Sequence, residues 1–203
     1  MQDKRLKTLV LSVVLSAFGP LVLMVAMFMN TAATQVADFV RRTAELGVLI
    51  LALWMYKKLS NPLKRSFKRR YGSTMYYASA GVLSFSALFL TVIIILDIVN
   101  PSIPEGNVLL GLTVAVLGAV VNSFFFVRYT LFNKERSSAI MDSQGNIYQA
   151  KLIVDVNVII ALASVLIFQE GWIIYWIDLT GTAVIVIYLL IRSATLFKKG
   201  KSA

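Results

Sequence analysis

The chain has 203 residues, of which 58% are hydrophobic and only 15% are charged. Soluble domains are about 45–50% apolar and about 25% charged, so this composition excludes an ordinary soluble domain and indicates a membrane protein. The net charge of +10 would suggest nucleic-acid binding in a soluble protein, but in a membrane protein Lys and Arg gather in cytoplasmic links, so we expect no nucleic-acid partner.

The absence of cysteine and histidine narrows the chemistry further. It excludes disulfide bonds, thiolate and imidazole metal ligands, and the side chain that most often acts as a general base near neutral pH. No nucleophile with an adjacent base stands out in the remaining sequence. We therefore predict that the chain is not an enzyme and holds no cofactor.

Six stretches of the chain come close to the length of about 20 mainly apolar residues that a helix needs to cross a bilayer. Helices are the expected form, because backbone polar groups cannot stay unpaired in lipid. We predict an all-α membrane protein, with one transmembrane domain over residues 1–203 built as a six-helix bundle. In chain order, the predicted spans are residues 9–29, 36–56, 75–98, 108–132, 147–168 and 172–197.

The basic residues divide the predicted links into two kinds. All but three of the 20 lysines and arginines lie near the chain ends or in or beside the links that follow the second and fourth spans. Because Lys and Arg are enriched in cytoplasmic links, we expect both termini in the cytoplasm and a multi-pass protein of a plasma (inner) membrane. The basic cluster between Lys57 and Arg70 either only sets this topology or also binds anionic lipid.

The second predicted span carries charged residues where lipid would surround a helix. Each charge at the centre of a membrane helix costs about 2.5–3.5 kcal/mol on insertion scales, so these side chains must pair, face the bundle interior or line water. Arg41 and Glu45 are four residues apart and share a helix face. The charged residues of this span are Asp38, Arg41, Arg42 and Glu45.

The fourth and fifth predicted spans add further polar residues. Lys151 and Asp155 repeat the spacing of four in the fifth span, although Lys151 lies near enough to its end to reach the surface by snorkelling. Asn122 and Asn157 are candidates for interhelical hydrogen bonds. The charged residues of the second and fifth spans form either a structural ion-pair network or an ion or proton pathway.

These segments resemble the transmembrane domain of the cation diffusion facilitator (cation efflux) family. The run Ala37-Asp38-x-x-Arg41-x-x-x-Glu45 is similar to that family's second-helix pattern A-D-x-x-(H/D)-x-x-x-D, and Lys151-x-x-x-Asp155 is similar to its fifth-helix pattern (H/D)-x-x-x-D. The segments VNSFFFVRY and WIDLTGTAVIVIYLLIRSA resemble its fourth and sixth helices. The resemblance implies six helices with cytoplasmic ends, a homodimer, and export of divalent metals such as zinc in exchange for protons.

The sequence departs from that pattern at the metal-ligand positions. Glu45 and Asp155 keep carboxylates, but Arg41 and Lys151 place cations at the other two positions, and arginine cannot donate a lone pair to a metal. The donors of any metal would be Glu45, Asp155 and Asp38, whose oxygens suit Mg²⁺ or Mn²⁺ better than zinc. The chain ends shortly after the sixth span, so we expect it to lack the family's cytoplasmic metal-binding domain.

Two functions are compatible with these observations. The first is a secondary transporter that moves a cation, either a divalent metal or another ion, with Lys151 able to carry a coupling proton. The second is a degenerate, non-transporting membrane subunit or scaffold in which an ion-pair cluster replaces the metal site.

Overall fold

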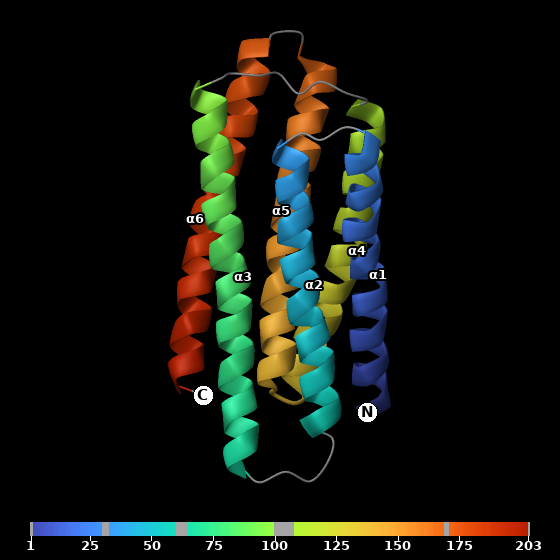
Figure 1. Ribbon diagram of the computed structural model, residues 1–203, viewed down its shortest axis with the longest axis vertical. Helices are drawn as coiled ribbons and strands as arrows, with labels where there is room; N and C mark the ends of the chain where they lie inside the picture. Colours follow the sequence, from blue (N-terminus) through green and yellow to red (C-terminus); the bar gives the residue numbers. More distant parts are fainter. Residues whose placement is uncertain (1, 30–32, 60–64, 100–107, 169–170, 203) are drawn as a thin grey trace.

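The computed structural model describes residues 2–29, 33–59, 65–99, 108–168 and 171–202, which fold into a bundle of long helices (Figure 1). No strand occurs in these described segments, which confirms the all-α class. The helices are α1 (Gln2–Met29), α2 (Ala33–Leu59), α3 (Arg65–Val99), α4 (Val108–Glu135), α5 (Ala139–Ile167) and α6 (Gly171–Ser202).

Five of the helices are long and apolar enough to cross a membrane: α1, α3, α4, α5 and α6. The helix α2 falls short of this criterion because Arg41, Arg42 and Glu45 interrupt its apolar sequence. It nevertheless belongs to the bundle, because it packs against α1, α3 and α5. The structure is therefore an all-α membrane bundle with a single, strongly charged member.

The helices extend beyond the predicted apolar spans, most clearly at two starts. The helix α3 begins at Arg65 rather than at residue 75, and α5 begins at Ala139 rather than at residue 147. In the first turns of α5, Ile140, Met141 and Gln144 are buried against neighbouring helices. Tertiary packing supports the helix there, whereas hydropathy marks only the part of a helix that contacts lipid.

The helices associate chiefly as the pairs α1–α2, α3–α6 and α4–α5, and α5 also contacts α2, α3 and α6. One hydrophobic core joins five helices through side chains such as Leu9, Leu49 and Phe125. A second core lies between α3, α5 and α6 around Leu83 and Leu189. The helix α5 therefore contacts four of the other helices, namely α2, α3, α4 and α6.

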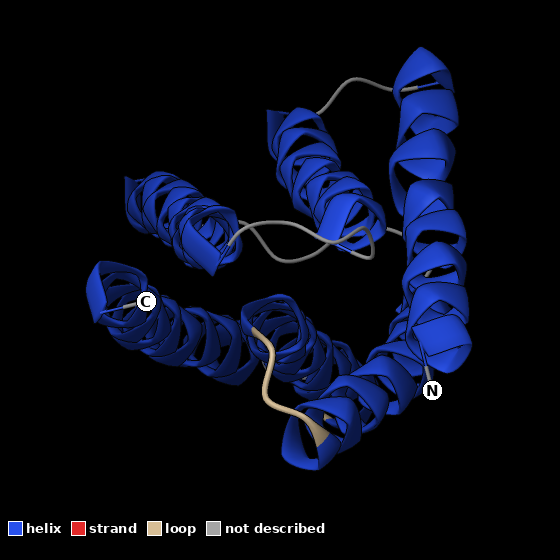
Figure 2. Cartoon of the chain, turned by 90° about the horizontal axis from the view of Figure 1, so that it is seen from below, coloured by secondary structure: helices blue, strands red, loops and turns tan. Residues whose placement is uncertain are grey.

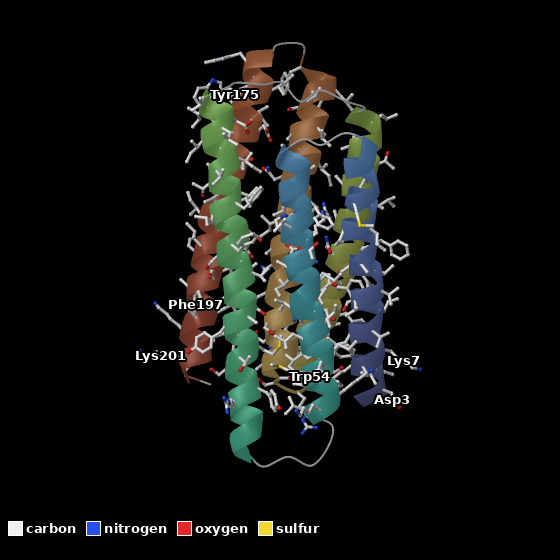
Figure 3. The ribbon with its side chains drawn as sticks, in the orientation of Figure 1. Asp3, Lys7, Trp54, Tyr175, Phe197 and Lys201 are labelled. Carbon is white, nitrogen blue, oxygen red and sulfur yellow. The ribbon has the colours of Figure 1, made fainter. Side chains whose placement is uncertain are left out.

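Both chain ends lie at the same end of the bundle, which we call the terminal end (Figure 1). Figure 2 looks at the bundle from this end and shows the short described link between α4 and α5 in tan. Lys7 and Lys201 lie at the terminal end, whereas Tyr175 lies at the opposite end (Figure 3). Of the basic cluster between Lys57 and Arg70, the structure describes the side chains of Lys57, Lys58 and Arg70, which are exposed.

Aromatic side chains gather near both ends of the bundle. Trp172 and Trp176 pack edge to face at the start of α6, with ring centroids 5.4 Å apart. Trp54 lies at the terminal end (Figure 3) and packs on Tyr71 at 6.3 Å. Trp and Tyr prefer the membrane–water interface, and the positions of the two groups match those of the aromatic belts in membrane-spanning bundles.

We expect the terminal end to face the cytoplasm, because the basic residues collect there. The chain has no cysteine, so single cysteines can report exposure directly. In intact cells, Lys201→Cys is expected to resist a membrane-impermeant maleimide, and Leu109→Cys near the opposite end is expected to react. The reverse labelling pattern would show that the bundle is inserted the other way.

Candidate functional site

Glu45 is the centre of a buried cluster of charges that joins two helices. Its side chain is only 7% exposed, and each of its carboxylate oxygens has a different cationic partner. Arg41 Nη1 lies 3.2 Å from Oε1 within α2, and Lys151 Nζ reaches across from α5 to lie 3.2 Å from Oε2. The pair of Glu45 with Lys151 is thus a direct link between α2 and α5.

Asp155 forms the second part of the cluster, one helical turn after Lys151. Asn122 of α4 donates a hydrogen bond through Nδ2 to Asp155 Oδ2 at 2.6 Å. Gly118, one turn earlier on α4, makes this approach possible, since a Cβ atom at that position would lie 3.3 Å from Oδ2. The Asp155 carboxylate also interacts electrostatically with the same cations that surround Glu45.

The position of Lys151 bears on two expectations drawn from the sequence. Its ammonium group forms an ion pair with Glu45 across α2 and α5, and it also acts electrostatically on Asp155 of its own helix. Because α5 begins at Ala139, Lys151 lies about three turns inside the helix and does not snorkel to its end. The side chain is 13% exposed, and Nζ lies 5.1 Å from the centroid of the Tyr148 ring.

The remaining predicted residues lie around this cluster. The side chain of Arg42 packs against Gly19 of α1 and acts electrostatically on both Glu45 and Asp155. Asn157 turns instead toward α6, where its amide lies so close to Gly181 that a side chain there would collide with it. Asp38 belongs to α2, but its side chain lies outside the described part of the structure.

The cluster lies at the depth where a bilayer would be most apolar. Glu45, Asn122 and Asp155 all fall near the middle of their helices. The described members are three cations and two carboxylates, namely Arg41, Arg42, Lys151, Glu45 and Asp155. Because arginine keeps its charge, the two guanidinium groups are permanent counter-charges to the two carboxylates.

The donor set does not resemble a metal centre. Within the described part of the chain, no group of three or more His, Cys, Asp or Glu residues is placed to hold a metal ion. The two carboxylates of the cluster that the structure describes are already engaged, one by Arg41 and Lys151 and the other by Asn122. A metal ion would have to displace these partners before it could be coordinated.

A group of hydrogen-bonded hydroxyls, which was not predicted from the sequence, lies between the cluster and the terminal end. The hydroxyl of Tyr148 lies 3.0 Å from Ser16 Oγ, and that of Tyr129 lies 2.7 Å from Ser12 Oγ. The two tyrosine rings stack with centroids 5.5 Å apart. The available signal was the pair of serines four residues apart in the first span, which places both hydroxyls on one face of that helix.

Together, the fold and the site define a polytopic membrane protein with a cluster of charged side chains near the middle of its helices. The family model for the cation efflux transmembrane domain matches residues 9–203 of the sequence. The chain belongs to the cation efflux family, which supports a role in cation transport. Among curated proteins, no sequence matches this chain significantly.

We expect the wild-type protein to bind zinc weakly, because cations occupy two positions that hold ligands in the family pattern. A double variant with Arg41→His and Lys151→His replaces both cations, and its two histidines together with Glu45 and Asp155 would form a set of four metal donors. Calorimetry on the purified protein should show zinc binding in the double variant and little in the wild type. Sub-micromolar zinc binding by the wild type that disappears in Asp155→Ala would contradict this interpretation.

Proposed function

We propose that the chain is a secondary transporter that exchanges a cation for a proton at the Glu45–Lys151–Asp155 cluster. The observation that carries the proposal is the ion pair of Lys151 with Glu45 across α2 and α5. In this pair the ammonium group occupies the place that a transported cation would take. Lysine is the one cation of the cluster that can lose its charge by releasing a proton.

The proposed exchange follows from this competition for Glu45. When Lys151 releases its proton, Oε2 of Glu45 loses its ionic partner, and the neutral amine gains a lone pair. A cation can then bind between the two carboxylates and the amine. Reprotonation of Lys151 restores the ion pair and expels the cation, so the two ions occupy the site in turn.

The charge of the cluster favours a monovalent cation in this exchange. One monovalent cation in place of the Lys151 proton leaves the charge of the cluster unchanged. A divalent cation would raise it by one unit. At about 4 Å and an effective dielectric constant of about 20, the repulsion between this additional unit charge and one neighbouring cation is on the order of 4 kcal/mol.

A specific observation also favours the second candidate, a non-transporting membrane subunit. Both oxygens of Glu45 already have cationic partners, and this is the arrangement that a purely structural ion-pair network would have. In such a protein the pairs would only fix the packing of α2 against α5, and no ion would compete for the carboxylate.

Transport in proteoliposomes separates the two candidates. We expect external Na⁺ or K⁺ to raise the internal pH, because a cation enters while a proton leaves, and we expect Mg²⁺, Mn²⁺ and Zn²⁺ to have much smaller effects. An internal pH dye gives the measurement, and Lys134→Met, which removes an exposed lysine of α4, is the matched control. A larger response to divalent ions would overturn the monovalent assignment, and no response to any ion would favour the structural subunit.

A further inference from the structure

A groove runs along the outer face of α4 and is separate from the charge cluster. Its volume is about 650 Å³. Its walls come from one face of α4, at helical spacings of three and four residues, and from one residue of α5. The lining residues are Val116, Ala119, Val120, Ser123, Phe124, Val127, Arg128, Leu131 and Leu152.

The groove has the length and polarity of a site for a lipid chain. From Val116 to Arg128 the helix rises about 18 Å, which compares with about 15 Å for half of a hydrocarbon core. Between these two residues the lining is apolar except for Ser123. Arg128 lies toward the terminal end, about two turns before α4 ends at Glu135.

Arg128 is the single charged residue in the lining of this groove, and other side chains hold it in place. Its Nε atom donates to Thr8 Oγ1 of α1 at 3.3 Å. Its guanidinium carbon lies 5.7 Å from the centroid of the Phe124 ring and 5.5 Å from that of Phe132. Among the described residues, no carboxylate lies within ion-pair distance of Arg128, so its Nη donors have no acidic partner there.

The exposed guanidinium group of Arg128 is suited to bind an anion. Guanidinium groups bind phosphate through paired hydrogen bonds, and basic residues at the edge of a membrane attract anionic lipid headgroups. The apolar stretch from Val127 to Val116 continues from Arg128 toward the bilayer centre, as an acyl chain continues from its headgroup. The polar and apolar parts of the groove therefore match the two parts of one phospholipid.

We propose that the groove holds an anionic phospholipid from the leaflet at the terminal end. Its phosphate binds Arg128, and one acyl chain lies along Val127, Val120 and Val116. This site is distinct from the basic cluster between Lys57 and Arg70, because its lining comes from α4 and α5.

Native mass spectrometry of the detergent-purified protein tests this proposal with two added lipids of identical acyl chains, phosphatidylglycerol and phosphatidylcholine. We expect the wild type to retain phosphatidylglycerol roughly five- to tenfold better. Arg128→Gln should lose this preference, whereas Lys134→Gln, which removes an exposed cation of α4 outside the groove, should keep it. Ala119→Trp fills the apolar part and should lower the retention of both lipids.

Three results would overturn the proposal. One is an unchanged lipid preference in Arg128→Gln. The second is displacement of the retained lipid by inorganic phosphate alone, which would reduce the site to a simple anion site. The third is efficient disulfide cross-linking of Val120→Cys in membranes, which would place a second copy of the chain in the groove. Arg128→Lys keeps the charge and should retain part of the preference, so it provides a readout if Arg128→Gln fails to fold.

Discussion

Replacing Glu45 with glutamine is expected to destabilise the bundle by about 3–5 kcal/mol, because it leaves the Lys151 ammonium buried without the carboxylate with which it pairs. For a chain of this size, 1 kcal/mol corresponds to about 2–4 °C in melting temperature, so the midpoint should fall by roughly 10 °C. Thermal unfolding in detergent, followed by circular dichroism, would measure this. A loss of only a few degrees would mean that water or lipid headgroups already solvate the cluster.

A double-mutant cycle would show that the cost comes from the ion pair across the two helices. Adding Lys151→Met to Glu45→Gln removes a stranded charge and should recover part of the lost stability. We expect a coupling above 1 kcal/mol, compared with about 0.3–0.5 kcal/mol for independent sites. The matched control is the pair of Lys199 with Asp142, whose side chains are 43% and 19% exposed and lie 2.6 Å apart. Because water screens this pair, its coupling should stay below about 1 kcal/mol.

The number and type of helices could be predicted from the sequence because the bilayer imposes a fixed apolar length on each span. The true starts of α3 and α5 could not, since outside the lipid a helix is stabilised by its neighbours and leaves no hydropathy signal. Hydropathy likewise could not show how the charged residues of α2 are compensated. The sequence predicts a span over residues 36–56, but its charged residues keep α2 from meeting the criterion for a membrane-spanning helix, and one partner that compensates Glu45 is a lysine of a distant helix.

The candidate site shows what spacing alone can and cannot predict. A separation of four residues correctly placed Arg41 beside Glu45, because both lie on one helix. The same spacing places Lys151 and Asp155 on one face of α5, but it does not by itself identify the ion pair of Lys151, because the packing of α5 on α2 brings the ammonium to Glu45. The link of Asn122 to Asp155 likewise depends on how closely α4 approaches α5 at Gly118, a tertiary feature without a local signature.

The second large effect is expected for Lys151→Met, which removes the proposed proton site while keeping an unbranched side chain. Proton movement driven by a cation gradient should fall by more than about tenfold, as it does when a group that transfers protons is removed. Binding of the cation should persist and become insensitive to pH, because Glu45 Oε2 no longer has a titrating competitor. The measurement combines an internal pH dye with uptake of the radioactive cation, and Lys134→Met should behave as the wild type.

Lys151→Arg separates a transport role from a structural one. Arginine can keep the ion pair with Glu45, but it cannot release its proton at any accessible pH. If the cluster exchanges ions, the variant should melt close to the wild type and yet lose both cation uptake and proton release, because the counter-cation can no longer leave. If the cluster serves only to hold α2 against α5, neither the wild type nor Lys151→Arg exchanges ions, and arginine simply keeps the ion pair with Glu45. Retained exchange in Lys151→Arg would therefore contradict the proposed coupling, whereas a stable but inactive variant would show that titration of Lys151, and not its charge alone, drives the exchange.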